Sequence, residues 1–251
     1  MVSLSVNVNK IALLRNSRHL NIPDVIWAVR TSLEAGAHGI TVHPRPDERH
    51  IRKVDVYQIA EVISSTSIPA STARAEFNIE GNPFLPPFME LVRDCRPDQC
   101  TLVPDVPEAF TSDQGWTLTE KNRIRLEPII NELKGLGCRV SLFMDSIPDE
   151  MAAAREIGAD RIELYTEPFA AAFGTESQKE TGEKFFLAAS AAKEAGLSVN
   201  AGHDLNLENL GELIRLIPFI EEVSIGHALV SDALQYGLFE TVKKYLKALK
   251  H

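Results

Sequence analysis

Cysteine is scarce in this chain, and its three residues, Cys95, Cys100 and Cys138, form no CxxC motif. An odd number without such a motif argues against a disulfide framework and predicts reduced thiols that act as small buried side chains. Long apolar runs are also missing, because no stretch reaches the roughly 18 residues that a membrane span needs. The segment 1–10 lacks the layout of a signal peptide. The sequence therefore predicts a soluble, cytoplasmic protein.

Positive charge is in short supply as well. The chain has 26 Lys and Arg residues against 35 Asp and Glu, which gives a net charge of −9. This balance argues against a nucleic-acid surface and against binding to an anionic membrane. Nucleotide-binding strings of the GxGxxG or GxxxxGK[ST] type are absent. The negative net charge does not exclude a phosphorylated small molecule as ligand, since a few arginines and helix N-termini suffice to bind one.

One junction recurs four times: a helix-like stretch ends at glycine and runs at once into a short β-branched segment. Glycine suits a helix end because it enters the left-handed region without a Cβ clash. The apolar run that follows is typical of a strand buried on both faces. Repetition of this unit predicts a parallel α/β fold. The four copies span 34–43, 134–145, 155–166 and 193–203.

Eight strand-like segments alternate with helical patterns along the whole chain. Eight rounds in 251 residues predict a single (β/α)8 TIM barrel, with a doubly wound open sheet as the alternative. We expect one domain over 1–251. The predicted strands are 4–9, 39–43, 76–80, 100–104, 139–145, 161–166, 197–203 and 222–227. The predicted helices begin near Pro23-Asp24 and continue at 55–65, 86–95, 118–137, 148–158, 181–196, 207–217 and 231–249.

Two features interrupt this regular pattern. Pro128 lies inside the predicted helix 118–137 and should kink it or split it in two. The connections 105–117 and 167–180 exceed the usual length. Both follow the C-terminal end of a strand, where a lid or an added helix would cover a site. We therefore expect these two connections to border the functional end of the barrel.

Histidines close three of the predicted strands: His43, His203 and His227, with His50 shortly after the first. Active groups of such barrels lie at the C-terminal strand ends. Histidine also exchanges protons near neutral pH. The sequence thus predicts acid–base groups gathered at one barrel mouth, although a structural role for each histidine is the alternative. A metal site is a further alternative, in which Asp145, Glu163 and Asp204 would supply the carboxylates. The sequence contains no HxH or HExxH motif to support it.

Other polar residues at strand ends support the same location. Glu80 closes the third strand in an apolar setting, so burial should raise its pKa and make it a usable acid or base. A salt bridge to Arg45 is the alternative. Asn7 and Asn9 should point from the first strand into the barrel to hold a substrate oxygen. Alternatively, they are buried polar groups that the backbone satisfies.

Phosphate-binding groups are expected on two sides of the mouth. Arg18 follows the first strand, and Arg45 is flanked by two histidines. After the last strand, Gly226-His227 leads to Ser231-Asp232, which has the residue types of a helix N-cap. Glycine amides and a helix N-terminus in this corner commonly bind phosphate.

Eight segments of the chain, in the same order, resemble the pyridoxine 5′-phosphate synthase family. GITVHPRPDERHI and VNAGHDL are the most distinctive of them, and together the segments cover essentially the whole sequence. The eight are VNVNKIALLRNSR (6–18), GITVHPRPDERHI (39–51), FNIEG (77–81), LVPDVPEAFTSDQGW (102–116), SLFMD (141–145), ADRIELYTEPFA (159–170), VNAGHDL (199–205) and SIGHALVSDAL (224–234).

The resemblance implies a (β/α)8 barrel with added helices, assembled as a homo-octamer, without metal or organic cofactor. It implies condensation of 1-deoxy-D-xylulose 5-phosphate with 3-amino-2-oxopropyl phosphate to pyridoxine 5′-phosphate, phosphate and water. By position, His43 and Glu80 correspond to proton acceptors and His203 to a proton donor. The substrate-binding residues implied are Asn7, Asn9, Lys10, Arg18, Arg45, His50, Thr111, Glu163, Asp204, Gly226 and His227.

Three positions depart from the family pattern: Asn9-Lys10 stands for Asp-His, Asp204 for Gly, and Tyr165-Thr166-Glu167 for His-Thr-Gly. Lys10 would replace a histidine donor with a permanent charge, and Asp204 would still offer its backbone N–H. Two rival functions follow. Lys10 is the one lysine at a strand end and would be the Schiff-base residue of a sugar-phosphate aldolase. The departures would also suit a non-catalytic binder of phosphorylated metabolites.

Overall fold

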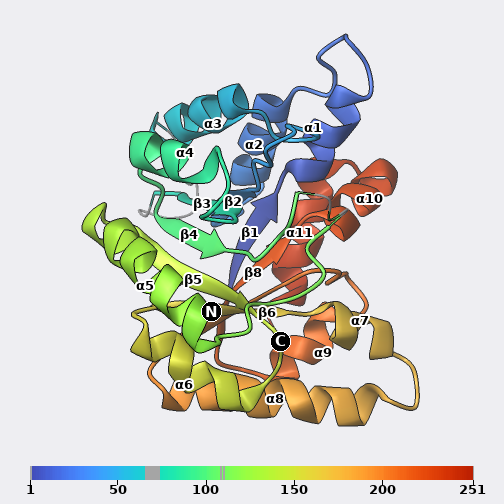
Figure 1. Cartoon of the computed structure of the whole chain (residues 1–251). Helices are drawn as coiled ribbons and strands as arrows, with labels where there is room; N and C mark the ends of the chain where they lie inside the picture. Colours follow the sequence, from blue (N-terminus) through green and yellow to red (C-terminus); the bar gives the residue numbers. More distant parts are fainter. Residues whose placement is uncertain (1, 66–73, 108, 110, 251) are drawn as a thin grey trace.

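The computed structural model of the chain describes residues 2–65, 74–107, 109 and 111–250. In this part of the chain, eight parallel strands pair in sequence order, and β1 also pairs with β8 (Figure 1). The predicted (β/α)8 barrel is confirmed, and its closure rules out the open sheet. The strands are β1 Ser3–Asn7, β2 Gly39–Val42, β3 Glu76–Gly81, β4 Gln99–Leu102, β5 Arg139–Met144, β6 Arg161–Tyr165, β7 Ser198–Gly202 and β8 Ile220–Ile225.

Eleven helices are present in the described residues, so three are additional to one helix after each strand. They surround the barrel on all sides (Figure 1). The added helix expected after the sixth strand is confirmed as α7. The helices are α1 Asn9–Asn16, α2 Val25–Glu34, α3 Lys53–Ser65, α4 Phe88–Cys95, α5 Glu120–Gly135, α6 Pro148–Glu156, α7 Glu167–Ala172, α8 Gln178–Glu194, α9 Leu210–Leu216, α10 His227–Tyr236 and α11 Leu238–Ala248.

Two of the added helices correct the sequence prediction. The first strand ends at Asn7, and α1 begins at Asn9, so the predicted strand 4–9 is too long. The predicted helix 231–249 is in fact α10 and α11, separated at Gly237, whose φ of 77° ends the first of them. Both errors have one cause: neither α1 nor α11 begins with a side chain that caps the helix. The usual start signal is therefore missing.

The four repeated glycine junctions fold as predicted. α2, α5, α6 and α8 each end shortly before a glycine in the left-handed region, and the next strand follows within a few residues. A Cβ at such a φ is strained, so glycine lets the chain turn directly from the outer helix into the barrel. The φ angles are 104° at Gly36, 88° at Gly137, 96° at Gly158 and 81° at Gly196.

The strands place apolar and polar residues on opposite faces. Leu4, Val6 and Ile40 are fully or almost fully buried in the main apolar core, which the barrel shares with its helices. Ser5 and Thr41 alternate with them, and their hydroxyl oxygens lie 2.6 Å apart across β1 and β2. The inner face of the barrel is therefore polar, which makes hydrogen-bonding groups available inside it.

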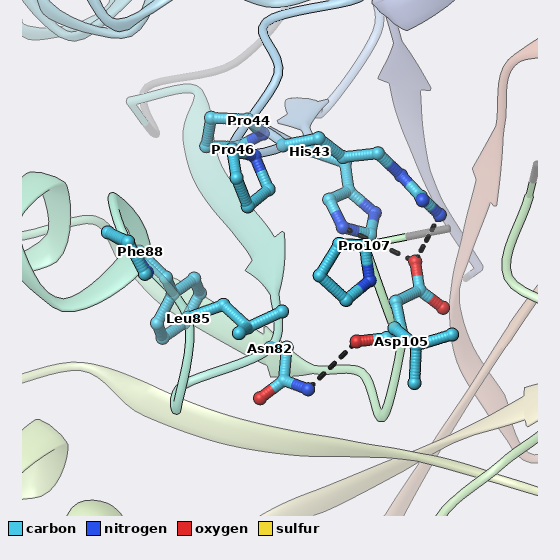
Figure 2. A pocket seen from close by; sticks show the side chains of 11 residues that line it. His43, Pro44, Pro46, Asn82, Leu85, Phe88, Asp105 and Pro107 are labelled. Atoms are coloured by element: carbon cyan, nitrogen blue, oxygen red, sulfur yellow. Dashed lines mark hydrogen bonds and ion pairs between the residues drawn. The ribbon is translucent and has the colours of Figure 1, made fainter. Parts of the chain in front are cut away.

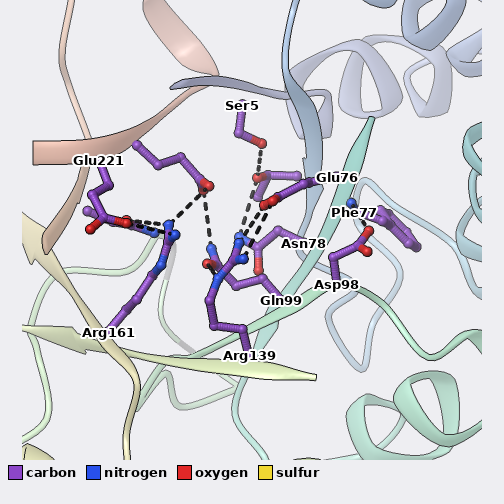
Figure 3. Close-up of polar contacts among 12 residues, drawn as sticks. Ser5, Glu76, Phe77, Asn78, Asp98, Gln99, Arg139, Arg161 and Glu221 are labelled. Carbon is purple, nitrogen blue, oxygen red and sulfur yellow. Dashed lines mark hydrogen bonds and ion pairs between the residues drawn. The ribbon is translucent and has the colours of Figure 1, made fainter. Parts of the chain in front are cut away.

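Ion pairs continue this polar interior toward the N-terminal ends of the strands (Figure 3). Arg139 forms an ion pair with Glu76 and donates from Nε to Gln99 Oε1 at 3.0 Å. Gln99 in turn donates to Glu222 Oε1 at 3.2 Å, and Arg161 Nη1 lies 3.6 Å from Glu222 Oε2. Buried charges need partners of this kind. The network fills the end of the barrel opposite the cavity described below.

The helix α5 runs unbroken from Glu120 to Gly135, so Pro128 does not split it, which was one of the two outcomes predicted. Proline removes one N–H from the helix. The buried side chains Leu126, Ile130 and Leu133 hold both halves against the barrel. Packing on this face thus compensates for the missing hydrogen bond.

The connection after β4 crosses the C-terminal end of the barrel without a helix in its described residues 105–107, 109 and 111–117. Its end is fixed to the neighbouring strand. Gly115 N–H donates to Asp145 Oδ1 at 3.1 Å, and Trp116 N–H donates to the Phe143 carbonyl at 2.8 Å. The connection is therefore attached where the sequence predicted a cover for the site.

The cysteines are free thiols, of which Cys100 and Cys138 are buried as predicted and Cys95 is half-buried. Within the described ranges, no helix combines the length and the apolar character needed to cross a membrane.

Candidate active site

A cavity of about 330 Å³ opens at the C-terminal ends of the strands. This volume is suited to a small molecule. His43, Glu80 and His203 all line it, although they lie far apart in the sequence, so the expected convergence at one barrel mouth is observed. The other predicted site residues that line the cavity are Asn7, Asn9, Lys10, Arg45, His50, Thr111, Glu163, Asp204, Gly226 and His227.

Asn7 and Asn9 connect the first strand to the acid–base residues. The Asn9 Oδ1 atom accepts a hydrogen bond from the His43 backbone N–H at 3.0 Å. Asn7 Oδ1 accepts from the Asn9 N–H at 3.0 Å, and Asn7 Nδ2 donates to Glu80 Oε2 at 3.4 Å. The amide oxygens are thus satisfied by the backbone, as the alternative interpretation proposed, and both residues also border the cavity.

His43 lies between two carboxyl groups. Its Nδ1 atom is 3.8 Å from Glu80 Oε2, and its Nε2 atom is 3.6 Å from Asp105 Oδ2. Burial lowers the pKa of His43 well below its ordinary value, and the Arg45 guanidinium adds to this effect. The imidazole is therefore neutral at neutral pH and has a free nitrogen lone pair that can accept a proton.

Two buried carboxyl groups face the interior of the barrel. Burial raises the pKa of Glu80 well above its ordinary value, and Glu163 adds to the rise. Burial also raises the pKa of Glu163 to about 8, with Glu222 contributing. The predicted pKa rise of Glu80 is confirmed. The alternative salt bridge to Arg45 is not formed, because Arg45 pairs with Asp105.

His203 follows β7 with a φ of 88°, a strained angle for a residue other than glycine. The Thr166 hydroxyl contacts the backbone on both sides of this angle, at 2.7 Å from the Gly202 carbonyl and 2.5 Å from the His203 carbonyl. The imidazole lies 5.5 Å from the Phe143 ring and 5.4 Å from the Tyr165 ring. Burial lowers the pKa of His203. The contacts of His203 with Thr166, Phe143 and Tyr165 were not predicted from the sequence.

The corner after β8 presents a helix N-terminus to the cavity. Gly226 is the N-cap of α10, and His227 is its first residue, so the prediction of an N-cap at Ser231-Asp232 is wrong. The true start is closer to the cavity. Free N–H groups and the helix dipole at such an end favour an anion. A Cβ at Gly226 would lie 3.1 Å from the Asn7 Cβ atom, so glycine permits this close approach of the chain.

Lys10 and Asp204 line the same cavity. Lys10 lies in the first turn of α1, and its charge contributes to the lowered pKa of His203. Asp204 adopts a φ of 56°, in the left-handed region that Asp tolerates better than most residues. Lys10 and Asp204, two of the residues that depart from the family pattern, thus lie at the cavity wall.

Arg45 and Arg49 fasten the connection after β4 over the mouth. Arg45 Nη1 donates to the Ala109 carbonyl at 2.6 Å, and Arg49 Nη1 donates to the same oxygen at 3.0 Å. Arg45 also pairs with Asp105. The sequence prediction missed Arg49 and Asp105. Asp105 follows β4 closely, so the rule applied to the histidines, a polar residue at a strand end, would have found it.

His50 lines the cavity near His43, with their ring centroids 6.3 Å apart. Its Nδ1 atom accepts a hydrogen bond from the Ile51 N–H at 2.9 Å. Burial lowers the pKa of His50 to about 4, and Arg45 adds to the effect. The ring is therefore neutral at neutral pH, with Nε2–H as its donor.

Arg18 is the predicted site residue that the structure places elsewhere. It lies beyond the end of α1 with an exposed side chain and is not part of the cavity wall. Leu20 and Ile22 follow it with exposures of 72% and 67%, so the segment carries apolar side chains on its surface.

The proposed metal alternative was based on Asp145, Glu163 and Asp204. Across residues 2–65, 74–107, 109 and 111–250, no group of three or more His, Cys, Asp or Glu side chains is arranged to hold a metal ion. Asp145 instead accepts the hydrogen bond from Gly115.

A closed (β/α)8 barrel with histidines and buried carboxyls around a cavity at the strand ends defines the class as a TIM-barrel enzyme. The chain belongs to the family described as pyridoxal phosphate biosynthesis protein PdxJ, whose model matches residues 4–251.

Relatives agree with this assignment. A pyridoxine 5′-phosphate synthase of Albidiferax ferrireducens is 50% identical over 251 residues, covering 98% of this chain and 96% of that protein. Another, from Cytophaga hutchinsonii, is 49% identical over 252 residues and covers 100% of both. Among solved structures, tryptophan synthase from M. tuberculosis matches 100% of this chain and 93% of that chain, with a TM-score of 0.64 and 14% identity. That likeness shows the fold alone.

Proposed function

We propose that this chain is a pyridoxine 5′-phosphate synthase, which condenses 1-deoxy-D-xylulose 5-phosphate with 3-amino-2-oxopropyl phosphate. The products are pyridoxine 5′-phosphate, inorganic phosphate and water. One observation carries the proposal: His43, Glu80 and His203 surround a single cavity in a chain whose relative of that name is 50% identical.

The proposed chemistry moves a proton at each step. An amine attacks a ketone and one water leaves as the imine forms, a phosphate leaves, and the ring closes with loss of a second water. Glu80 and His43 take and return protons during imine formation and ring closure, and His203 protonates the departing oxygen. The neutral His43 ring and the raised pKa of Glu80 support these roles. Each group of this kind contributes on the order of 10²–10⁴-fold to the rate.

Phosphate binding is proposed at the corner after β8. The N-terminus of α10, whose N-cap Gly226 lines the cavity, would supply backbone N–H groups there, with His227 and Lys10 as side-chain donors. Asp204 would contribute its backbone N–H rather than its carboxylate, since the carboxylate repels an anion.

The remaining substrate contacts are proposed on the opposite wall. Arg45 and His50 would bind the second phosphate. Thr111 would close over it from the connection after β4, which excludes water from reactive carbonyl intermediates. The remaining polar groups would contact substrate oxygens from the strands: Asn7, Asn9 and Glu163.

We also propose that residues 1–251 form one catalytic domain, that the protein is cytoplasmic, and that it assembles as a homo-octamer. The exposed apolar residues Leu20 and Ile22 suit a contact between subunits. Arg18 lies in the same segment, away from the cavity of its own subunit. Its proposed binding role therefore requires either that the octamer places it at the cavity of a neighbouring subunit or that the segment moves. Light scattering of the purified chain tests the octamer, and a monomer at assay concentration would contradict it.

The central test is the activity of His43→Asn and His203→Asn with both phosphorylated substrates. Loss of pyridoxine 5′-phosphate formation in each variant, with unchanged folding by circular dichroism, is the expected result. Turnover near the parent rate in both variants would refute the proton-transfer roles.

A Schiff-base aldolase is the second candidate, because Lys10 lines the cavity close enough to His203 to affect its pKa. Borohydride treatment in the presence of a sugar phosphate would trap an adduct on Lys10 if this candidate were right. Binding of both substrates without release of phosphate would instead favour the non-catalytic binder.

A further inference from the structure

Asp105 is a buried carboxyl group beside the cavity that contacts two proposed functional residues. Its Oδ2 atom accepts hydrogen bonds from Arg45 Nη2 and from Ser112 Oγ, the latter at 2.9 Å. The same oxygen lies 3.6 Å from His43 Nε2, and Figure 2 shows the ring and the carboxyl group side by side. Asn82 Nδ2 donates to the Asp105 carbonyl at 2.9 Å. Both the side chain and the backbone of Asp105 are therefore held in place.

The two ring nitrogens of His43 have different neighbours. Nε2 faces Asp105, whereas Nδ1 is 3.8 Å from Glu80. Burial raises the pKa of Asp105, but the contacting Arg45 guanidinium opposes that rise and favours the carboxylate. Among the described residues, no lysine or arginine forms an ion pair with Glu80, and its raised pKa favours the neutral acid. The carboxylate on the Nε2 side therefore attracts the single ring proton to Nε2.

The other charged groups around His43 come from several elements and do not reverse this preference. The two arginines and the two other histidines act on the total charge of the ring, by opposing its protonated form. Only the carboxyl groups distinguish the two ring nitrogens, because each nitrogen faces a different one. The full set facing His43 is Arg45, Arg49, His50, Glu80, Asp105 and His203.

We propose that Asp105 is a positioning residue: its carboxylate holds the His43 proton on Nε2 and leaves Nδ1, on the Glu80 side, as the proton acceptor. The same carboxylate keeps the Arg45 guanidinium next to the ring. The distance of 3.6 Å shortens to a hydrogen bond when the ring becomes charged, as catalytic contacts commonly do on substrate binding. The kinetic consequence depends on the proposed function, whereas the position of the proton does not.

The unliganded wild-type protein provides the first test. Nitrogen-15 NMR of histidine-labelled protein distinguishes the two neutral tautomers, and the His43→Asn variant assigns the signal. We expect His43 to be neutral at pH 7.5 with its proton on Nε2. A proton on Nδ1 overturns the proposal. This measurement needs no substrate, so it stands even if the synthase activity is absent.

Asp105→Asn provides the second test, because an amide of the same size can donate to Nε2 and force the proton onto Nδ1. We expect kcat for pyridoxine 5′-phosphate formation to fall on the order of 10²-fold, with a smaller change in KM. The matched control is Asp160→Asn, which weakens the partly buried ion pair of Lys134 and Asp160 just before β6, at the end of the barrel opposite the cavity. It should lower stability and leave kcat and the His43 signal unchanged.

Equal effects of the two substitutions on kcat would overturn the proposal, since Asp105 would then be one more buried ion-pair partner. If Asp105→Asn does not fold, the wild-type tautomer decides alone. A wild-type protein with the Nε2 proton but no synthase activity refutes the proposed function and leaves the positioning role intact.

Discussion

Removal of the Thr166 hydroxyl should impair His203 without unfolding the barrel. Thr166 is fully buried, and its Oγ1 atom lies 2.7 Å from the Gly202 carbonyl and 2.5 Å from the His203 carbonyl. It thereby holds the peptide that gives His203 its φ of 88°. Thr166→Val keeps the shape and removes the donor.

The expected magnitude follows from the contacts. Loss of the hydroxyl leaves the His203 carbonyl without this partner and costs about 1–3 kcal/mol of unfolding free energy, while the Gly202 carbonyl keeps the Thr166 backbone N–H at 3.0 Å. The φ at His203 carries strain on the order of 1–3 kcal/mol, which is no longer opposed and favours a relaxed backbone. A shift of the imidazole by about 1 Å lowers kcat on the order of 10²-fold. Thr166→Ser keeps the hydroxyl and should restore most of the activity.

Thr241→Val is the matched control. Thr241 is also fully buried, and its hydroxyl donates to the Gly237 carbonyl at 2.9 Å in α11, away from the cavity. Urea unfolding and steady-state assays of the variants separate stability from catalysis. We expect similar losses of stability for both valine variants and a loss of kcat for Thr166→Val alone. Full kcat in Thr166→Val would refute the role assigned to this hydroxyl.

Three further predictions concern the cavity wall and the connection after β4. Between pH 4.5 and about 8, the folded protein keeps a proton on Glu163 that the unfolded chain loses, so stability falls as pH rises through this window. The unfolding free energy of Glu163→Gln, measured in urea, should depend less on pH than that of the wild type. An unchanged pH dependence would contradict the burial argument. Gly226→Ala places a Cβ 3.1 Å from Asn7 and should raise KM for the phosphorylated substrates roughly tenfold; an unchanged KM argues against a phosphate site there. Gly115→Ala places a Cβ 2.2 Å from the Asp145 backbone nitrogen, so proteolysis of the connection after β4 should accelerate; wild-type resistance would show that the contact does not fix this segment.

The sequence predicted the barrel because its strongest signals are local. Glycines such as Gly36 and Gly196 stop helices by backbone conformation alone, and the buried strands follow at once. Once the strands are parallel, their C-terminal ends must meet. The convergence of His43 and His203 was therefore predictable without any knowledge of side-chain contacts.

The parts that were missed depend on contacts between distant segments. Asn9 continues the alternation of the first strand, yet its side chain accepts the N–H of His43, the residue after β2, and α1 begins at Asn9. Thr166 reaches His203 because β6 and β7 pair with Tyr165 opposite Gly202. Neither relation is visible in local sequence. Asp105 is different, because its position after a strand was informative and only its partners were hidden.

Phosphate release measured with both substrates, and with each alone, tests the account most directly. The proposed condensation predicts inorganic phosphate and pyridoxine 5′-phosphate in equal amounts when 1-deoxy-D-xylulose 5-phosphate and 3-amino-2-oxopropyl phosphate are both present. With either substrate alone, or with His43→Asn, enzyme-dependent release should be close to zero. Equal release from one substrate alone, or none from the pair, would contradict the proposal that this cavity joins the two molecules.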